Sequence, residues 1–367
     1  MVVPWGLFAD RGCGRLRRLL FHRADTDSVI GFDNTKAVFP IHRSVRFALV
    51  TTTTGRPTGR TLCRFGETDV ASLDGLPDSV DERSRETFYP ILLSPALLIR
   101  LSGDDLAVPD VRSPIDLEIL ERTTSVFPWL SAPDGWSAHF GRELNASEDR
   151  HHFVEGGTGL PVVEGKHLEP FVAHLASVRF RIPVAVASRL LAGSRSFRRW
   201  RLAYRDVASA TNRVTLIAAI LPPDCVTTHT VFCLKTALDA DAQWFLCGVM
   251  NSYVANYLVR LRVTTHVSAG IVERLPVPLV PTDAGVGAAI VSASRQVAAR
   301  MLATGDDRLQ ALVARLYDLT AEQFWRVLET FPLVEEERRR AAFEEFLKLK
   351  RSQDSGIRQL PPAGSRG

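Results

Sequence analysis

The chain has 367 residues, of which 46% are hydrophobic and 23% are charged, and a formal net charge of +4. This composition is typical of a globular protein with enough chain for two or three packed units. No run of ~18 uncharged apolar residues occurs, which excludes a membrane-spanning helix. The arginines near the start follow the apolar residues, which is not the order of a secretory signal. We therefore expect a cytoplasmic protein with no membrane partner.

Residues 1–66 predict strands around one helix and resemble the end of a larger α/β sheet. The strands are expected at 1–7, 28–34, 43–53 and 61–67. So few elements cannot cover both faces of such a sheet. We therefore expect an incomplete sheet with an exposed apolar face around Phe47, Leu49 and Val50.

Two local patterns add detail to this region. Residues 11–23 predict a basic amphipathic helix with Leu16, Leu19 and Leu20 on one face. The turn sequence Gly55-Arg56-Pro57 predicts that the last strand pairs back onto the preceding one.

Residues 67–135 predict helical connectors punctuated by prolines. Within them, residues 114–126 form an expected helix with Ser113 as N-cap and Pro114 in the first turn. Residues 136–282 predict a mixed α/β region that includes one helix over 242–262. Its expected buried face consists of Leu246, Met250, Tyr253, Tyr257, Leu258 and Leu261.

Residues 283–350 predict a helical segment. One apolar stripe in it consists of Leu309, Leu312, Val313, Leu316 and Tyr317. Thr320 and Gln323 form a predicted capping box that opens the next helix. The tail over 351–367 is rich in Gly, Pro and Ser and is expected to be disordered.

A concentration of arginine is the main electrostatic feature of the sequence. Between Arg189 and Arg213 there are seven arginines and one acid, Asp206. The guanidinium fork can bind a phosphate or a guanine edge through two hydrogen bonds. The stripe therefore suits DNA contact, and an ordinary solvated face is the alternative.

Other polar groups have weaker signals. Thr228-His229-Thr230 and Thr264-Thr265-His266 each lie beside an extended segment and are either binding groups or satisfied turn residues. Lys166 and His167 in EGKHLEPF are either phosphate contacts or part of an exposed loop. His151-His152 has no acidic or cysteine partner at ligand spacing, which argues against a metal site. Cys225 and His229 are four residues apart, as a thiol nucleophile and its base could be, but nothing in the sequence marks an oxyanion hole or an orienting carboxylate, so we do not expect a hydrolase.

Cysteine usage also excludes two classes of protein. The five cysteines have no C-x-x-C pair, which argues against a disulfide framework and a structural zinc site. They are Cys13, Cys63, Cys225, Cys233 and Cys247.

Three stretches carry a resemblance to a known family. They are IGFDNTKAVFPIHRSVRFALVT (30–51), GRELNASEDRHHF with GLPVVEGKHLEPF (141–171), and WRLAYRDVASATNRVTLIAAILPPDCVTTHTVFCLK through GVMNSYVANYLVRLRVTTHVSAGIVERLPVP (200–278). In this order they resemble the C-terminal part of large DNA adenine methyltransferases of the type IIG restriction–modification kind and related phage-defence methylases. The end of the chain, LVARLYDLTAEQFWRVLETFP, is similar to the helical close of the same proteins.

The resemblance implies a mixed α/β fold in five parts. These are the last strands of a Rossmann-like methyltransferase sheet (1–66), a helical connector (67–135), a DNA target-recognition domain (136–282), C-terminal helices (283–350) and the disordered tail (351–367). Double-stranded DNA is the implied partner. The residues expected to bind it are Lys166, Arg198, Arg199, Arg201, Arg205, Asn212, Arg213, His229, Arg260, Arg262 and His266.

The catalytic motifs of that family are absent from the sequence. The family holds S-adenosylmethionine through a glycine-rich loop and the target adenine through an Asn-Pro-Pro-aromatic motif. The Pro-Pro pairs here, Pro222-Pro223 and Pro361-Pro362, follow neither Asn nor Asp and precede no aromatic residue. Neither Gly12-Cys13-Gly14 nor the glycines at 156–159 lie between an apolar strand and a helix.

We therefore expect no catalytic residue, no metal and no cofactor in this chain, with S-adenosylmethionine belonging to the complete enzyme. The chain is then the DNA-recognition part of an adenine methyltransferase, inactive alone, whose catalytic half precedes Met1 or is separately encoded. A free-standing DNA-specificity or interaction subunit, and a non-functional gene remnant, remain as alternatives.

Overall fold

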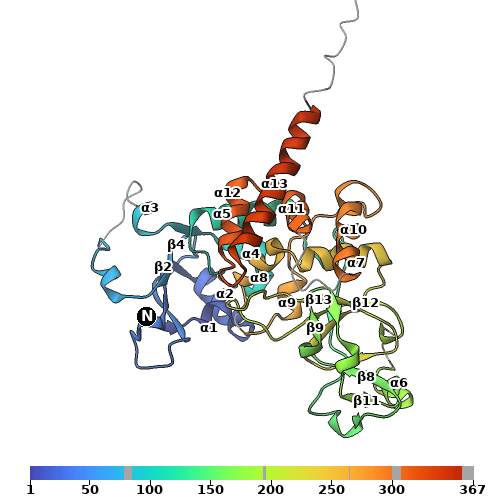
Figure 1. Ribbon diagram of the computed structural model, residues 1–367. Helices are drawn as coiled ribbons and strands as arrows, with labels where there is room; N and C mark the ends of the chain where they lie inside the picture. The colour runs from blue at the N-terminus through green and yellow to red at the C-terminus, as the bar shows by residue number, and fades with distance from the viewer. Residues whose placement is uncertain (78–84, 193–195, 264, 300–306, 358–367) are drawn as a thin grey trace, which may run out of the picture. The chain divides into compact units, whose positions relative to one another are not determined.

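The computed structural model describes residues 1–77, 85–192, 196–263, 265–299 and 307–357 and shows the mixed α/β fold that the sequence predicts (Figure 1). The chain divides into two compact units. Unit 1 consists of Met1–Trp129, Arg260–Thr264 and Gly270–Pro276, and unit 2 of Leu130–Val259, Thr265–Ala269 and Val277–Gly367. The predicted boundary at residue 66 thus falls inside unit 1. The predicted target-recognition and C-terminal segments fall largely in unit 2.

Unit 1 is built on sheet A, with strand order β1-β3-β2-β4-β5. Its strands are β1 (Val2–Pro4), β2 (Ala24–Asp33), β3 (Arg46–Thr54), β4 (Thr61–Glu67) and β5 (Ile91–Leu93). Its helices are α1 (Gly6–Ala9), α2 (Gly14–Arg23), α3 (Arg85–Phe88), α4 (Pro95–Ser102) and α5 (Pro114–Val126). The short helix α9 (Ala269–Val272) begins in a segment of unit 2 and ends in unit 1.

Strand β4 pairs in parallel with β2 and not with β3, so the predicted hairpin is wrong. The link between β3 and β4 explains the difference. Thr58 Oγ1 accepts a hydrogen bond from Thr26 N and donates one to Ala24 O, each 2.8 Å long. These two hydrogen bonds hold the link between β3 and β4 against the start of β2. Because Val29 and Ile30 point to opposite faces and are both buried, β2 takes a central place in the sheet.

The expected exposed apolar face of sheet A does not exist. Phe47 and Val50 are buried, and the Phe47 ring stacks on Phe32 with centroids 5.0 Å apart. Leu73 and Tyr89 pack against this cluster from the region that the sequence analysis treated as a connector. The prediction was wrong because segments beyond residue 66 cover the sheet.

Helix α2 also turns a different face inward from the one predicted. Leu16 and Leu19 are exposed, whereas Arg17, Leu20 and Phe21 are buried. The Arg17 guanidinium donates to backbone carbonyls of three residues, which makes its burial tolerable. They are Leu7, Asp10 and Asp105.

Helix α5 begins where its sequence predicts. Ser113 Oγ accepts from Asp116 N, and the Asp116 carboxylate accepts from Ser113 N, which completes a capping box with Pro114 in the first turn.

Unit 2 contains two four-stranded arrangements among its described residues. Sheet B has the order β13-β12-β15-β6 and sheet C the order β14-β8-β11-β7. Their strands are β6 (Phe140–Gly141), β7 (Val154–Glu155), β8 (Leu160–Val163), β11 (Phe180–Ile182), β12 (Arg201–Arg205), β13 (Ala218–Leu221), β14 (Val226–Thr227) and β15 (Val231–Leu234). The strands β9 (Leu168–Glu169) and β10 (Val172–Ala173) pair with each other.

The helices of unit 2 include a long predicted helix that is in fact two. The helices are α6 (Val184–Leu190), α7 (Ala240–Met250), α8 (Tyr253–Arg260), α10 (Gly285–Ala299), α11 (Asp307–Leu316), α12 (Ala321–Glu329) and α13 (Glu336–Ile357). The predicted helix over 242–262 is interrupted between α7 and α8, although its predicted buried face is indeed buried. The interruption positions two amides against the edge of sheet B. Asn251 pairs with the backbone of Ala218, and Asn256 Oδ1 accepts from Thr215 N and Leu216 N.

The C-terminal helices follow the sequence prediction closely. Thr320 caps α12 through the predicted box with Gln323. Helix α13 continues to Ile357, so the predicted disordered tail is wrong for residues 351–357, and 358–367 lie outside the described residues. Within the described part of the chain, no helix is both long and apolar enough to cross a bilayer.

Candidate nucleic-acid interface

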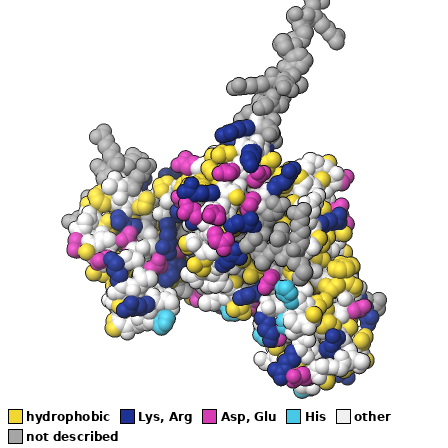
Figure 2. All heavy atoms as spheres, in the orientation of Figure 1, with side chains coloured by type: hydrophobic (Ala, Val, Ile, Leu, Met, Phe, Trp, Pro, Cys, Tyr) yellow, Lys and Arg dark blue, Asp and Glu magenta, His cyan; other side chains and the backbone are white. Residues whose placement is uncertain are grey.

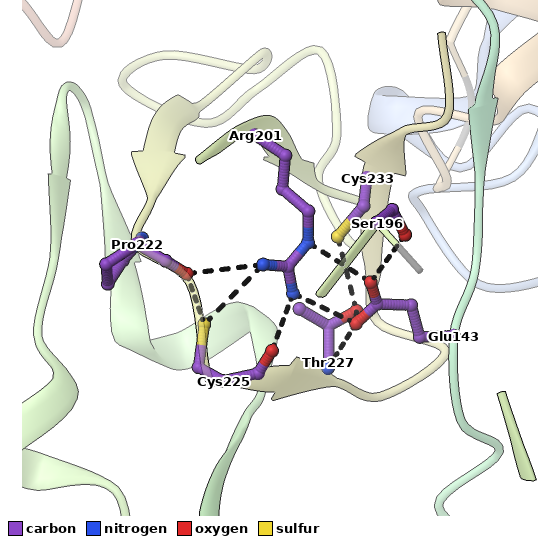
Figure 3. A network of polar contacts seen from close by, with 7 residues as sticks. All are labelled: Glu143, Ser196, Arg201, Pro222, Cys225, Thr227 and Cys233. Atoms are coloured by element: carbon purple, nitrogen blue, oxygen red, sulfur yellow. Dashed lines mark hydrogen bonds and ion pairs between the residues drawn. The ribbon is translucent and has the colours of Figure 1, made fainter. Parts of the chain in front are cut away.

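Arg201, the centre of the predicted arginine stripe, lies in the interior of unit 2. Its side chain is 1% exposed and forms a bidentate ion pair with Glu143, whose side chain is 0% exposed. Figure 3 shows the guanidinium pointing into a ring of acceptors. The prediction that Arg201 contacts DNA is therefore wrong.

Every part of this buried pair has a partner. The Arg201 guanidinium also donates to Pro222 O at 3.3 Å and to Cys225 O at 2.8 Å. The Glu143 carboxylate accepts from Ser196 Oγ and from both the backbone N and Oγ1 of Thr227 (Figure 3). Burial alone would lower the pKa of Arg201, but the acidic groups around it, Cys233 and Glu143, raise it above its ordinary value. The network therefore joins sheet B to β14 and to the 3-10 helix η8 (Ser196–Arg198).

Of two further predicted contacts, Arg260 is buried and Arg262 is half-buried. Arg260 is 8% exposed, and Arg262 donates to the backbone carbonyls of Leu101, Ile271 and Arg274. Burial lowers the pKa of each to about 10. Since Arg260 is buried, the prediction of DNA contact is wrong for it, whereas for the half-buried Arg262 it remains a prediction.

The remaining residues of the stripe lie at or near the surface. Arg198 is exposed, with a hydrogen bond to Ser188 Oγ, and Arg199 is half-buried. Asn212 and Arg213 are half-buried in the loop between β12 and β13. Their contact with DNA remains a prediction, and Arg195 and Thr264 lie outside the described residues.

One end of sheet B brings together polar side chains from separate stretches of sequence. Here β6 and β12 end, β15 begins, and Val207 bridges to His266. We call this group the sheet-end cluster. It consists of Arg142, Lys166, Arg205, Asp206, Thr230 and His266.

Asp206 is the centre of the sheet-end cluster. Its Oδ2 accepts from Arg142 Nη2 at 3.1 Å and lies 3.2 Å from His266 Nδ1. The Asp206 side chain is 3% exposed, whereas those of Arg142 and His266 are 49% and 58% exposed. Hydrogen bonds to Thr230 O and from Val267 N fix its backbone. Its Oδ1 is buried and accepts no hydrogen bond from the described residues.

A glycine allows the Lys166 segment to approach this cluster. Gly165 N donates to Thr230 Oγ1 at 2.9 Å, and a Cβ at Gly165 would lie 3.1 Å from both Arg205 Cγ and Thr230 O. A larger residue would push this backbone away from Arg205. Lys166 follows directly and is exposed, with an ion pair to Glu164.

His229 is half-buried in the same loop as Thr230, and its Nδ1 accepts from Ala146 N. Of the predicted binding residues, Lys166 follows the glycine that contacts Arg205, and His266 pairs with Asp206, the next residue after Arg205; His229 lies in the loop that contains Thr230. In Figure 2, dark-blue and cyan side chains gather on the lower right, near the place where Figure 1 labels β9.

The sequence analysis missed Arg142 and Asp206. Arg142 is a single charge outside the arginine stripe, and Asp206 was counted only as an acid within it. Their pairing depends on β6 lying beside β15, which no short pattern in the sequence indicates. The Arg142 guanidinium lies 4.8 Å from the centre of the Phe232 ring, which holds it in place.

The described residues contain no cluster of His, Cys, Asp and Glu that could hold a metal ion. Cys225 and His229 do not form a reactive pair, because the Cys225 thiol donates to Pro222 O and burial raises its pKa. The cluster is suited to binding because the exposed Arg142 and His266 side chains are held by one fixed carboxylate, that of Asp206.

No protein-family model matches the chain, and no curated protein matches it. Among solved structures, it is similar to the type IIL restriction–modification enzyme MmeI, solved in complex with DNA, at 10% identity and a TM-score of 0.43, over 99% of this chain and 47% of that one.

A second neighbour is the type IIG restriction endonuclease BpuSI, at 11% identity and a TM-score of 0.39, over 95% of this chain and 47% of that one. The HsdS subunit from Thermoanaerobacter tengcongensis matches at 14% identity and a TM-score of 0.25, over 65% of this chain and 50% of that one. The chain spans about half the length of these proteins. At these identities the likeness concerns the fold alone.

Proposed function

We propose that this chain recognises a target sequence in double-stranded DNA for site-specific adenine-N6 methylation, within a restriction–modification or related defence system. Methyl transfer and S-adenosylmethionine binding are assigned in this proposal to a catalytic unit outside these 367 residues, for which a separately encoded chain is one form. The three sequence stretches that resemble adenine methyltransferases support the assignment to methylation.

The observation that carries the proposal is the sheet-end cluster. Reading of a base edge requires donors and acceptors held at fixed positions, because the groove presents both kinds of group. Arg142 and His266 supply exposed donors, and the Asp206 carboxylate holds them. Arg205 directly precedes Asp206, and Lys166 follows Gly165, which contacts Arg205; both are cations suited to phosphate contact.

The salt dependence of DNA binding tests this assignment. The chain is titrated with duplex DNA at several salt concentrations, alongside variants R142A, K166A and R205A. Each phosphate contact that is lost should reduce the slope of log K against log salt by about 1. The matched control is R340A, which removes an exposed cation from α13. A cluster triple variant with the same slope and affinity as R340A would remove the cluster from the interface.

Target recognition has a second test. Duplexes retained by the chain from a random pool are sequenced, and the source cells' DNA is mapped for N6-methyladenine. We expect one enriched motif that contains an adenine methylated in those cells. A pool without any enriched motif would contradict target recognition, and an enriched but unmethylated motif would contradict the assignment to methylation.

A further inference from the structure

An aromatic pocket in unit 2 has no role in the sheet-end cluster. Its cavity is about 490 Å³, within the range of small-ligand sites. It is lined by Arg199, Trp200, Ile220, Leu238, Ala240, Gln243 and Trp244. Trp200 is 59% exposed, an unusual position for so large an apolar side chain.

The walls of the pocket are fixed before any ligand arrives. Gln243 Oε1 accepts from Leu202 N at 2.8 Å, and its Nε2 donates to Leu238 O at 2.9 Å. Arg199 Nη2 donates to Lys235 O and Thr236 O at 2.7 and 3.0 Å. Since these groups are held by backbone atoms, the pocket binds a ligand with little loss of side-chain entropy.

The polar side-chain groups of the pocket that make no hydrogen bond to the described residues are donors. The indole N–H groups of Trp200 and Trp244 make no hydrogen bond to the described residues, and Arg199 has its Nε and Nη1 remaining. The Gln243 amide oxygen is already used, and no acid lines the cavity. The acids on either side of Ala240 have other partners: Asp239 caps α7 by accepting from Ala242 N, and Asp241 forms an ion pair with Arg295. A suitable ligand is therefore planar, is rich in hydrogen-bond acceptors, and carries a negative charge close to its ring.

We propose that the aromatic pocket binds an unpaired, carbonyl-bearing nucleobase of DNA, thymine before adenine, stacked on Trp200. This inference rests on the proposed function. Extrusion of an adenine for methylation leaves a thymine without its partner, so the proposed reaction itself supplies such a base. Thymine presents two carbonyl acceptors to the donors of the pocket. Among the side chains that line the pocket, adenine would leave both N–H bonds of its amino group without an acceptor, whereas thymine would leave one, its N3–H.

The adjacent charges suit the rest of the nucleotide. Arg198 and Arg199 precede Trp200, and Arg198 is exposed. A phosphate joined to a base stacked on Trp200 would therefore meet cationic side chains. Stacking of a base on an aromatic side chain, next to arginine, is the usual way in which proteins hold unpaired nucleotides.

The test uses duplexes of one sequence with a single unpaired thymine, a single unpaired adenine, or neither. We expect the thymine duplex to bind roughly tenfold more tightly than the perfect duplex, and the adenine duplex to gain less. W200A should abolish the thymine advantage, whereas W200F, which keeps a ring, should retain most of it. Thymidine 5′-monophosphate should quench tryptophan fluorescence of the wild-type chain more than deoxyribose 5-phosphate does.

Equal affinity for the three duplexes, or a thymine advantage that survives in W200A, would overturn the inference. Equal gains for thymine and adenine would overturn the donor argument and with it the preference for thymine. Binding of the perfect duplex, with its dependence on the sheet-end cluster, is measured in the same series. If that binding persists while the thymine advantage is absent, only this inference fails; if R142A, K166A and R205A also leave it unchanged, the proposed interface fails.

Discussion

Replacement of Arg201 by methionine should destabilise unit 2 by about 3 kcal/mol. Removal of one partner leaves the other as an unpaired charge in the interior. In R201M the Glu143 carboxylate would still accept from Ser196 Oγ and twice from Thr227, which keeps the loss near the lower end of the usual range of about 3–5 kcal/mol. In E143A the guanidinium keeps only the two backbone carbonyls of Pro222 and Cys225, and Thr227 N loses its acceptor. We expect E143A to be the more damaging of the two.

Urea unfolding of the whole chain, followed by tryptophan fluorescence, measures both effects. The double variant R201M/E143L should lose less than the two single losses added together, because no unpaired charge remains. R198M, at an exposed position, is the control and should change stability by no more than about 0.5 kcal/mol. The reasoning is refuted if R201M unfolds at the same urea concentration as R198M, or if the two single losses simply add.

Three other predictions concern pH, thiols and helix packing. Burial and the nearby Lys166 lower the pKa of His167, whose Nδ1 accepts from Glu164 N. The stability that His167 contributes is therefore present above the unfolded pKa of about 6.5 and is lost as the pH falls from there towards the folded pKa. The melting temperatures of the wild type and H167Q should diverge across that pH window, and parallel curves would contradict this prediction. Burial raises the pKa of Cys63, Cys233 and Cys247, the second to about 11, so a thiol reagent at pH 8 should modify these three only after denaturation; prompt reaction of any of them in the native chain would show that it is accessible. A Cβ at Gly248 would lie 2.2 Å from Ser294 Oγ and 3.1 Å from Ile290 Cγ2, so G248A should lower stability by about 1–3 kcal/mol, with G12A, which has open space, as the control; an unchanged melting temperature would show that α7 and α10 separate freely.

Local patterns in the sequence predict the helices of this chain well. Ser113 and Thr320 each begin a helix at the expected residue, because a cap depends only on side chains three positions apart. The buried face of α7 and α8 is likewise correct, since it follows from helical spacing. The interruption between them was not predicted, because it depends on where Asn251 meets β13.

Features that depend on distant residues were predicted less well. The stretch around Phe47 looked exposed because its cover, Leu73 and Tyr89, comes from outside the strands considered. Arg201 looked like a surface residue because its partner, Glu143, lies 58 positions away. A run of arginines indicates the local charge but does not show which of the side chains form ion pairs with acids in the interior. In this chain Arg201 forms such a pair.

The amides of Asn251 and Asn256 have a consequence for association between molecules. β13 is the outermost strand of sheet B, and a strand in that position offers unpaired N–H and C=O groups to any extended segment that approaches. The two asparagines occupy such groups at Ala218, at Thr215 and at Leu216, just before the strand. A further strand could pair with β13 here only after α7 and α8 had separated from it. This cover protects the sheet from edge-to-edge aggregation.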